Sequence, residues 1–387
     1  MASCSRKLPR ISDKISSPSA SVIANNNDLL IPILLYLPVR SLIVFKCVSK
    51  GWSSLISDPL FIRKYTIQAR LSSPGLFLLK LSYADNFAYE FIRLDGKKVN
   101  GGVPLKFLNF VNDAPGLKID GSCNGLICCS SFRCAPTSDE TYYIYNPSTN
   151  RYKSILKFEH QPNSLVSVRS VSVAFNPLIS PHYKVVFVWE VGKDQLQIEI
   201  FDLQTATWKV SGKPFRGHND SFRRSGVFWN GSLHWINATK FGKWISLSNS
   251  FGYFDMEQEL LMEMPVPPTP DIDEGYDRRI GYFGAYKGCL HLIPIYNHYS
   301  TCFEILEMDN NYRSLHGVEF SILLVREEDK EEESNLVIHI PGKIICYKFK
   351  DMSFITTHNL SPNPIGEESL HYRWFYAHQY IESLAIV

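Results

Sequence analysis

One strand-like ending recurs at nearly constant spacing through most of the chain. A short apolar stretch followed by Asp or Asn occurs at intervals of 51, 56, 53 and 54 residues, at Asp95, Asn146, Asp202, Asp255 and Asp309. A weaker sixth copy ends at Asp351. The Asp or Asn side chain can accept a bond from the backbone N–H two residues on, which closes a turn between strands. Self-similarity at this period predicts repeated β units.

A second marker supports the repeat. Turn glycines precede a buried strand at Asn124-Gly125, Asn230-Gly231 and Lys287-Gly288. A unit of about 50 residues has room for four strands, the size of a kelch-type propeller blade. We therefore expect an all-β domain over residues 75–387, a β-propeller of about six kelch-like blades. Five or seven blades, or an irregular β-sandwich, are the alternatives.

Residues 27–67 follow a helical pattern instead. Leu29, Ile33 and Leu37 recur at i, i+4 and i+8, and Pro38 ends this first helix. So short a segment buries too little surface to be stable alone. It is either a helical cap on the next domain or, as the excess of apolar residues favours, a docking module completed by a partner. Residues 1–26 have the composition of a disordered tail.

The same segment resembles the F-box of the large plant F-box family. It reads Leu37-Pro38-Val39-Arg40-Ser41-Leu42 and then Phe45-Lys46-Cys47-Val48-Ser49-Lys50, where the family commonly has Leu-Pro-Val-basic-Ser-Leu and Phe-basic-Cys-Val-Ser-Lys. The resemblance implies binding to the Skp-type adaptor of an SCF (Skp–cullin–F-box) ubiquitin ligase and, through it, to the cullin. The family's apolar contact positions correspond here to Leu29, Ile33, Leu34, Leu37, Pro38, Val39, Leu42 and Val48.

The β domain is similar, more loosely, to the F-box-associated domain that follows the F-box in many plant proteins, and Tyr380–Leu384 looks like its usual end. Two departures from the F-box pattern stand out. Asn25 and Asn26 replace a Leu-Pro pair, and Pro32 stands where a helix former is expected. Deep in a helix, a proline costs about 3 kcal/mol. These departures predict weaker adaptor binding than is usual for the family.

No motif for catalysis is found in the sequence. P-loop, dinucleotide and nucleophile-elbow patterns are missing. Cys123, Cys128, Cys129 and Cys134 lack zinc-ligand spacing and are interpreted as buried thiols. We therefore expect a non-catalytic protein with no cofactor and no metal, and an enzymatic propeller is the third alternative.

A target-binding site can be predicted only from topology. In a propeller, the connections between successive blades share one face, here about 156–169, 211–224 and 265–280. The last two are rich in Arg and aromatic residues, which are enriched at the energetic centres of protein interfaces. The candidates are Arg216, His218, Phe222, Arg223, Arg224, Tyr276, Arg278 and Arg279. A solvent-exposed rim without a partner is the other interpretation.

These features together predict a substrate-recognition adaptor of an SCF-type ubiquitin ligase. An F-box scaffold that does not promote degradation is the alternative. The balance of 40 basic and 38 acidic residues gives no field that would favour nucleic acid or an anionic membrane. The N-terminus lacks an apolar signal segment, and nine cysteines without regular spacing are typical of reduced thiols. We expect the protein in the cytoplasm or the nucleus.

Overall fold

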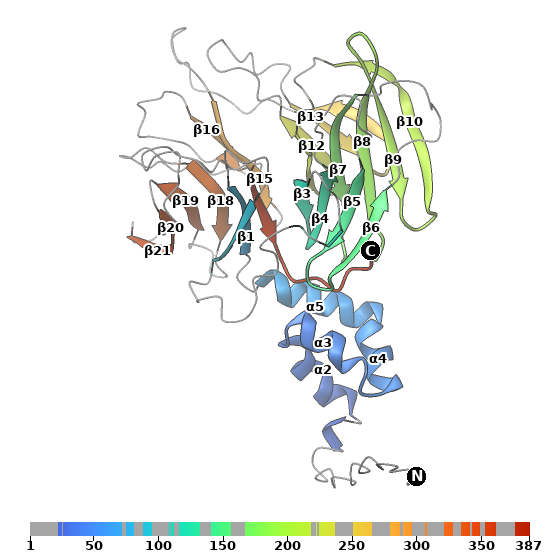
Figure 1. Cartoon of the computed structure of the whole chain (residues 1–387), viewed down its shortest axis with the longest axis vertical. Coiled ribbons are helices and arrows are strands. Elements are labelled where there is room, and N and C mark those ends of the chain that lie inside the picture. Colours follow the sequence, from blue (N-terminus) through green and yellow to red (C-terminus); the bar gives the residue numbers. More distant parts are fainter. Residues whose placement is uncertain are drawn as a thin grey trace, which may run out of the picture.

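The computed structural model describes the chain in segments: residues 22–24, 26–71, 75–80, 88–94, 108, 110–111, 116–131, 141–155, 167–217, 222, 224–236, 251–264, 279–286, 289–295, 306–307, 321–327, 334–340, 343–348, 353–360 and 376–387. Within them, a group of helices stands below a ring of β-sheets (Figure 1). No helix in these segments combines the length and hydrophobicity that a membrane crossing requires.

Four helices form the N-terminal module, and polar side chains cap the start of three of them, α2, α4 and α5. They are α2 (Asn27–Leu35), α3 (Val39–Phe45), α4 (Lys50–Ser57) and α5 (Pro59–Leu71). Ser49 Oγ caps α4 by accepting from the Trp52 N–H at 3.1 Å, and Asp58 Oδ1 caps α5 by accepting from the Leu60 N–H at 2.7 Å. A short helical turn at residues 22–24 precedes them, and the rest of the predicted tail, apart from Asn26, lies outside the described residues.

Asn26 and Pro32 have clear places in the first helix. Asn26 is the N-cap of α2 and accepts from the Asp28 N–H at 2.9 Å, so this departure from the family pattern still starts a helix. Pro32 is the sixth residue of α2, past the first turn, and it removes an N–H that would bond within the helix. α2 is therefore intrinsically weak and depends on packing.

The core of the helical module is apolar and draws on all four helices. Leu30 and Leu34 of α2, Val39 and Leu42 of α3, Ile56 of α4, and Phe61, Tyr65 and Ala69 of α5 form one buried cluster. Leu384, from the far end of the sequence, belongs to the same cluster. The helical module is thus completed by a residue of the C-terminal segment.

The β domain consists of antiparallel sheets in chain order. The first has the order β2 (Ala88–Arg93), β1 (Gly75–Lys80), β22 (Ala377–Tyr380). The second contains β3 (Leu117–Cys123), β4 (Leu126–Ser131), β5 (Tyr142–Asn146) and β6 (Arg151–Ile155). The third contains β7 (Val168–Ala174), β8 (Lys184–Gly192), β9 (Gln195–Asp202) and β10 (Thr207–Arg216).

Three further sheets continue the series. The fourth contains β11 (Val227–Trp229), β12 (Ser232–Ile236), β13 (Phe251–Asp255) and β14 (Leu260–Glu263). The fifth contains β15 (Arg279–Tyr286), β16 (Cys289–Ile295) and β17 (Leu306–Glu307). The sixth contains β18 (Ser321–Glu327), β19 (Ser334–Ile340), β20 (Lys343–Lys348) and β21 (Ser353–Asn359).

The sheets form a closed ring. Contacts run from β22 to β3, from β3 to β7, from β7 to β11, from β11 to β15 and from β15 to β18. A buried cluster that includes Leu76, Leu78, Leu323 and Val337 joins the sixth sheet to the first. The expected all-β, propeller-like domain is confirmed. The blade number of six stays a prediction, which the six sheets of the described segments support.

The first sheet unites the two ends of the β domain. β22, the C-terminal strand, pairs antiparallel with β1, with Gly75 opposite Tyr380 and Leu78 opposite Ala377. β22 also contacts β3 of the second sheet. The ring is therefore closed by hydrogen bonds between strands about 300 residues apart in sequence.

The recurring Asp and Asn residues act as the sequence predicts. Asn146, Asp202 and Asp255 each accept from the backbone N–H two residues on, at 2.9, 2.8 and 2.9 Å. The second marker also forms its turn, since both residues of Asn124-Gly125 and of Asn230-Gly231 have positive φ. The other predicted endings, Asp95, Asp309 and Asp351, lie outside the described residues.

Candidate adaptor-binding surface

The residues predicted to contact an adaptor divide into two sets. Leu34, Val39 and Leu42 are fully buried in the core of the helical module, so they shape the surface and cannot contact a partner directly. For these three, the contact role is corrected. The apolar stripe of the sequence is wide enough to include both the inner and the outer side of each helix, and spacing alone does not separate them.

The other predicted residues reach the surface. Leu29, Ile33 and Val48 are 46, 50 and 60% exposed, respectively. Pro38 is exposed, and Leu37 is half-buried against the core. Three large apolar side chains exposed on a module of this size call for an explanation, because water contact with them is unfavourable.

Sequence reasoning missed further exposed apolar residues of the helical module, among them Tyr36, Val44, Leu60 and Ile67. Tyr36 is 77% exposed and lies three residues after Ile33 and seven after Leu29, on the same side of α2. Val44 of α3 is also exposed. The i, i+4, i+7 spacing on α2 was the signal that could have identified Tyr36. We call Leu29, Ile33, Tyr36, Val44 and Val48 the exposed apolar set.

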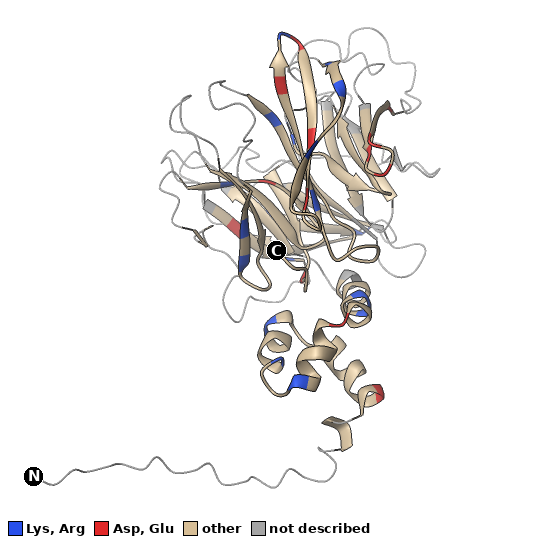
Figure 2. Ribbon diagram, turned by 90° about the vertical axis from the view of Figure 1, so that its right-hand side faces the viewer, with Lys and Arg blue, Asp and Glu red and all other residues tan. Residues whose placement is uncertain are grey.

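The helical module is basic, and part of its charge faces the propeller. Its Lys and Arg residues outnumber its acidic ones (Figure 2). Burial and the nearby charge of Arg151 on β6 lower the pKa of Lys46. Burial raises the pKa of the Tyr145 and Tyr380 hydroxyls, and the positive charge of Arg40 partly offsets this rise. Arg40 therefore lies near both tyrosines. The start and the end of α3 therefore lie close to the propeller.

The C-terminal segment holds the module on the ring. We call residues 381–387, which follow β22, the strap. The Glu382 carboxylate accepts from the Val39 N–H at 2.9 Å and from the Tyr65 hydroxyl at 3.1 Å. The Tyr65 hydroxyl also lies 3.0 Å from the Leu37 carbonyl oxygen, within donating distance. Burial, followed by the charge of Glu382, raises the pKa of Tyr65, which therefore remains a donor.

The strap is equally fixed on the propeller side. The buried Asn146 amide donates to the carbonyls of Ser383 and Ala385 at 3.0 and 2.9 Å. The Ser383 N–H donates to Ser148 Oγ at 3.0 Å. At Gly125, a Cβ atom would come within 2.4 Å of Ser383 Cβ, so only glycine admits the strap at this turn.

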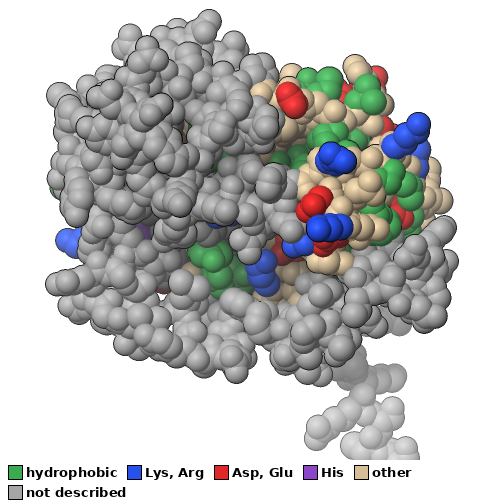
Figure 3. All heavy atoms as spheres, turned by 90° about the horizontal axis from the view of Figure 1, so that it is seen from above, with side chains coloured by type: hydrophobic (Ala, Val, Ile, Leu, Met, Phe, Trp, Pro, Cys, Tyr) green, Lys and Arg blue, Asp and Glu red, His purple; other side chains and the backbone are tan. Residues whose placement is uncertain are grey.

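Of the predicted target-binding residues, the structure describes Arg216, Phe222 and Arg224. β10 ends at the face opposite the helical module, because strands of the third sheet alternate in direction. Arg216 is exposed at that end, and Arg224 is half-buried, with its carbonyl accepting from Ser170 Oγ at 2.8 Å. Figure 3 views this face, on which described charged side chains of both signs are exposed.

One of these candidates is corrected. Phe222 is 7% exposed and packs against Phe215 and Trp235 with ring centroids 5.7 and 5.3 Å away, so its ring fills the core and is not free for a partner. An aromatic residue in a loop does not by itself indicate whether it faces inward. His218, Arg223, Tyr276, Arg278 and the side chain of Arg279 lie outside the described residues.

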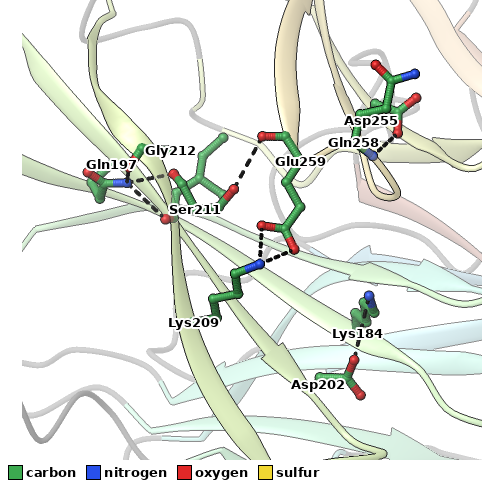
Figure 4. Close-up of polar contacts among 10 residues, drawn as sticks. Lys184, Gln197, Asp202, Lys209, Ser211, Gly212, Asp255, Gln258 and Glu259 are labelled. Atoms are coloured by element: carbon green, nitrogen blue, oxygen red, sulfur yellow. Dashed lines mark hydrogen bonds and ion pairs between the residues drawn. The ribbon is translucent and has the colours of Figure 1, made fainter.

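Charged groups at the outer edge of the ring have structural partners. Lys209 of β10 pairs with Glu259, in the turn between β13 and β14, at 2.8 Å (Figure 4). Ser211 Oγ lies 3.4 Å from the Glu259 carbonyl, and Gln197 Nε2 donates to the Ser211 carbonyl at 2.8 Å. These contacts tie the third sheet to the fourth.

Chemistry-bearing side chains of the described segments are dispersed. There, no group of three or more His, Cys, Asp or Glu residues is arranged to hold a metal ion. Cys128 and Cys129 are buried thiols, and burial raises the pKa of both; Cys134 lies outside these segments. His234 and His291 occupy equivalent repeat positions, and burial lowers the pKa of both, that of His291 to about 4.

Comparison with known proteins agrees with this architecture. Residues 26–64 match the model of the F-box domain, and residues 108–290 match that of the F-box associated beta propeller domain. The F-box protein At5g07610 of Arabidopsis thaliana is 29% identical over 100% of both chains. The F-box/kelch-repeat protein At3g23880 of the same plant is 22% identical over 69% of this chain and 71% of its own.

The matched F-box domain and the matched F-box associated domain together identify the class: the protein is an F-box protein. More particularly, it belongs to the plant F-box family in which an F-box associated β-propeller domain follows the F-box.

Proposed function

We propose that the protein is the substrate-recognition subunit of an SCF-type ubiquitin ligase. In this proposal, residues 27–67 bind a Skp-type adaptor, which links them to a cullin, and the β domain of residues 75–387 binds a target protein. The observation that carries the proposal is the exposed apolar set on an F-box. Its members, among them Ile33, Tyr36 and Val48, lie in water in the free chain, and an adaptor would cover them.

The two binding functions occupy opposite ends of the molecule. The helices stand at one face of the ring, and the connection after β10, with Arg216, emerges at the other. A target bound there would be held near a ubiquitin-charged enzyme, and the acceleration would come from proximity. This mechanism assigns no bond chemistry to the chain itself. Among the described cysteines, Cys47, Cys128 and Cys129 are free thiols, which fits action in the cytoplasm or the nucleus.

The proposal is tested by co-purifying the chain with a Skp-type adaptor and a cullin. Ile33→Asp places a charge in the exposed apolar set, and we expect at least a tenfold loss of adaptor affinity. Ile179→Asp is the matched control, since Ile179 is 80% exposed in the turn between β7 and β8. Equal adaptor binding by both variants, or none by the folded unmodified chain, would refute the adaptor role.

An F-box scaffold without a role in degradation is the second candidate. Pro32 within α2 favours it, because a helix weakened by about 3 kcal/mol presents its exposed residues less stably. A chain that binds the adaptor while leaving the ubiquitination of its captured partners unchanged would support the scaffold.

A further inference from the structure

The strap contacts the F-box at the turn that carries its signature motif. Glu382 accepts from the N–H of Val39, and Tyr65, which donates to Glu382, also reaches the carbonyl of Leu37. Leu384 is buried in the F-box core. Two neighbouring strap residues thus hold the backbone of the Leu37–Val39 turn and the interior behind it.

The Val39 N–H requires an acceptor from outside its own helix. The first N–H groups of an α-helix have no partner within the helix and are commonly satisfied by a side chain at the N-cap. The N-cap of α3 is Pro38, whose side chain makes no such bond. Glu382, which is 343 residues later in the sequence, supplies it.

The strap is itself attached to the propeller. Its backbone is bonded to Asn146 and Ser148 of the second sheet, and Ala385 lies in the buried cluster between the second and third sheets. The Glu382 carboxylate is therefore attached to the ring, although it acts on the helices.

We infer that Glu382 is a positioning residue, which fixes the orientation of the F-box relative to the propeller. The inference rests on the proposed function in one respect: orientation matters because the adaptor would bind the F-box while the target binds the ring. It then determines which target lysines reach the ubiquitin-charged enzyme, since small displacements of reacting groups lower rates strongly.

Hydrogen exchange on the full-length chain tests the inference. In Glu382→Ala we expect the backbone amides of residue 37 and residues 39–42 to exchange about tenfold faster, because a hydrogen bond to a charged group is lost. Amides of β7, β8 and β9 should keep their protection. Glu382→Gln retains an acceptor oxygen and should restore most of the protection. Glu257→Ala, at an exposed turn residue of the fourth sheet, is the control and should change nothing.

Small-angle X-ray scattering supplies a readout of orientation. The unmodified chain and Glu382→Gln should fit one arrangement of helices and ring, whereas Glu382→Ala should require several. Unchanged exchange at residue 37 and residues 39–42 in Glu382→Ala, or equal loss of protection in β7–β9, would overturn the positioning role. Neither readout uses the adaptor, so they remain decisive even if the unmodified chain fails to bind it and the proposed function is wrong.

Discussion

The Asn146 side chain offers a stringent test of how the strap is held. At this repeat position the third and fourth sheets have Asp202 and Asp255, whose carboxylates close their own turns, and Asp202 also pairs with Lys184 at 3.6 Å. Asn146 does the same with its carbonyl oxygen and also donates its amide to two strap carbonyls. A carboxylate could close the turn but could not make these two bonds. We therefore expect Asn146→Asp to release the strap while preserving the turn.

The magnitude follows from the bonds that are lost. The carbonyls of Ser383 and Ala385 would each lose a donor in a buried site, at about 1–3 kcal/mol apiece, so destabilisation of at least about 2 kcal/mol is expected. The reciprocal change, Asp202→Asn, is the control. It keeps the acceptor for the Gln204 N–H and removes only a partly exposed 3.6 Å ion pair with Lys184, for which we expect about 0–1 kcal/mol.

Urea unfolding of both variants and the unmodified chain at pH 7 is the assay. Burial would raise the pKa of the introduced carboxylate. When the folded state raises the pKa of a group, that group favours folding most at a pH below its pKa in the unfolded chain. It favours folding least at a pH above its pKa in the folded chain. The penalty of Asn146→Asp should therefore shrink on acidification to about pH 4, near the unfolded pKa of Asp. Free energies of unfolding for the two variants that agree within about 0.5 kcal/mol, the usual spread of surface substitutions, would refute the reasoning.

Two further predictions concern the turn at Gly125, which touches the strap, and His378 of the closing strand β22. Gly125→Ala should destabilise the chain more than Gly231→Ala. Both glycines have positive φ, but only at Gly125 would the added Cβ meet the strap. Thermal unfolding measures the difference, and equal shifts of the midpoint temperature in the two variants would contradict the prediction. Burial, followed by the charge of Lys118, lowers the pKa of His378 to about 3, so the unfolded chain binds a proton below about pH 6.5 that the folded chain does not. Folding should weaken by up to about 1.4 kcal/mol per pH unit from that group between pH 6.5 and 3. His378→Asn should flatten the fall in urea-unfolding free energy between pH 7 and 5, and an unchanged slope would exclude His378 as its source.

Local chemistry explains what could be predicted from the sequence. Turn closure at Asn146, Asp202 and Asp255 depends on residues two apart, so the repeat and its strands could be recognised from spacing. The caps at Ser49 and Asp58 are local in the same way. The F-box motif is a contiguous stretch, and its resemblance to a family needs no knowledge of long-range contacts.

Contacts between distant residues explain what could not be predicted. Nothing near Val39 in sequence indicates that Glu382 bonds to it, although the residues around Glu382 resemble the usual end of the domain. The inward side of each F-box helix depends on how α2, α3 and α5 meet, and for that reason Leu34 and Ile33 could not be told apart. Phe222 was misassigned because loop residues of a propeller can pack between sheets.

Closure of the ring by β22 also has a consequence for synthesis. The ribosome delivers the F-box first and the closing strand, β22, about 300 residues later. Until that strand and the residues after it leave the ribosome, β1 lacks its β22 partner and Val39 lacks Glu382. A message truncated before the codons of β22 would therefore yield a protein with the exposed apolar set and an open ring. Synthesis of β22 is thus the step that closes the ring and brings Glu382 to the helices.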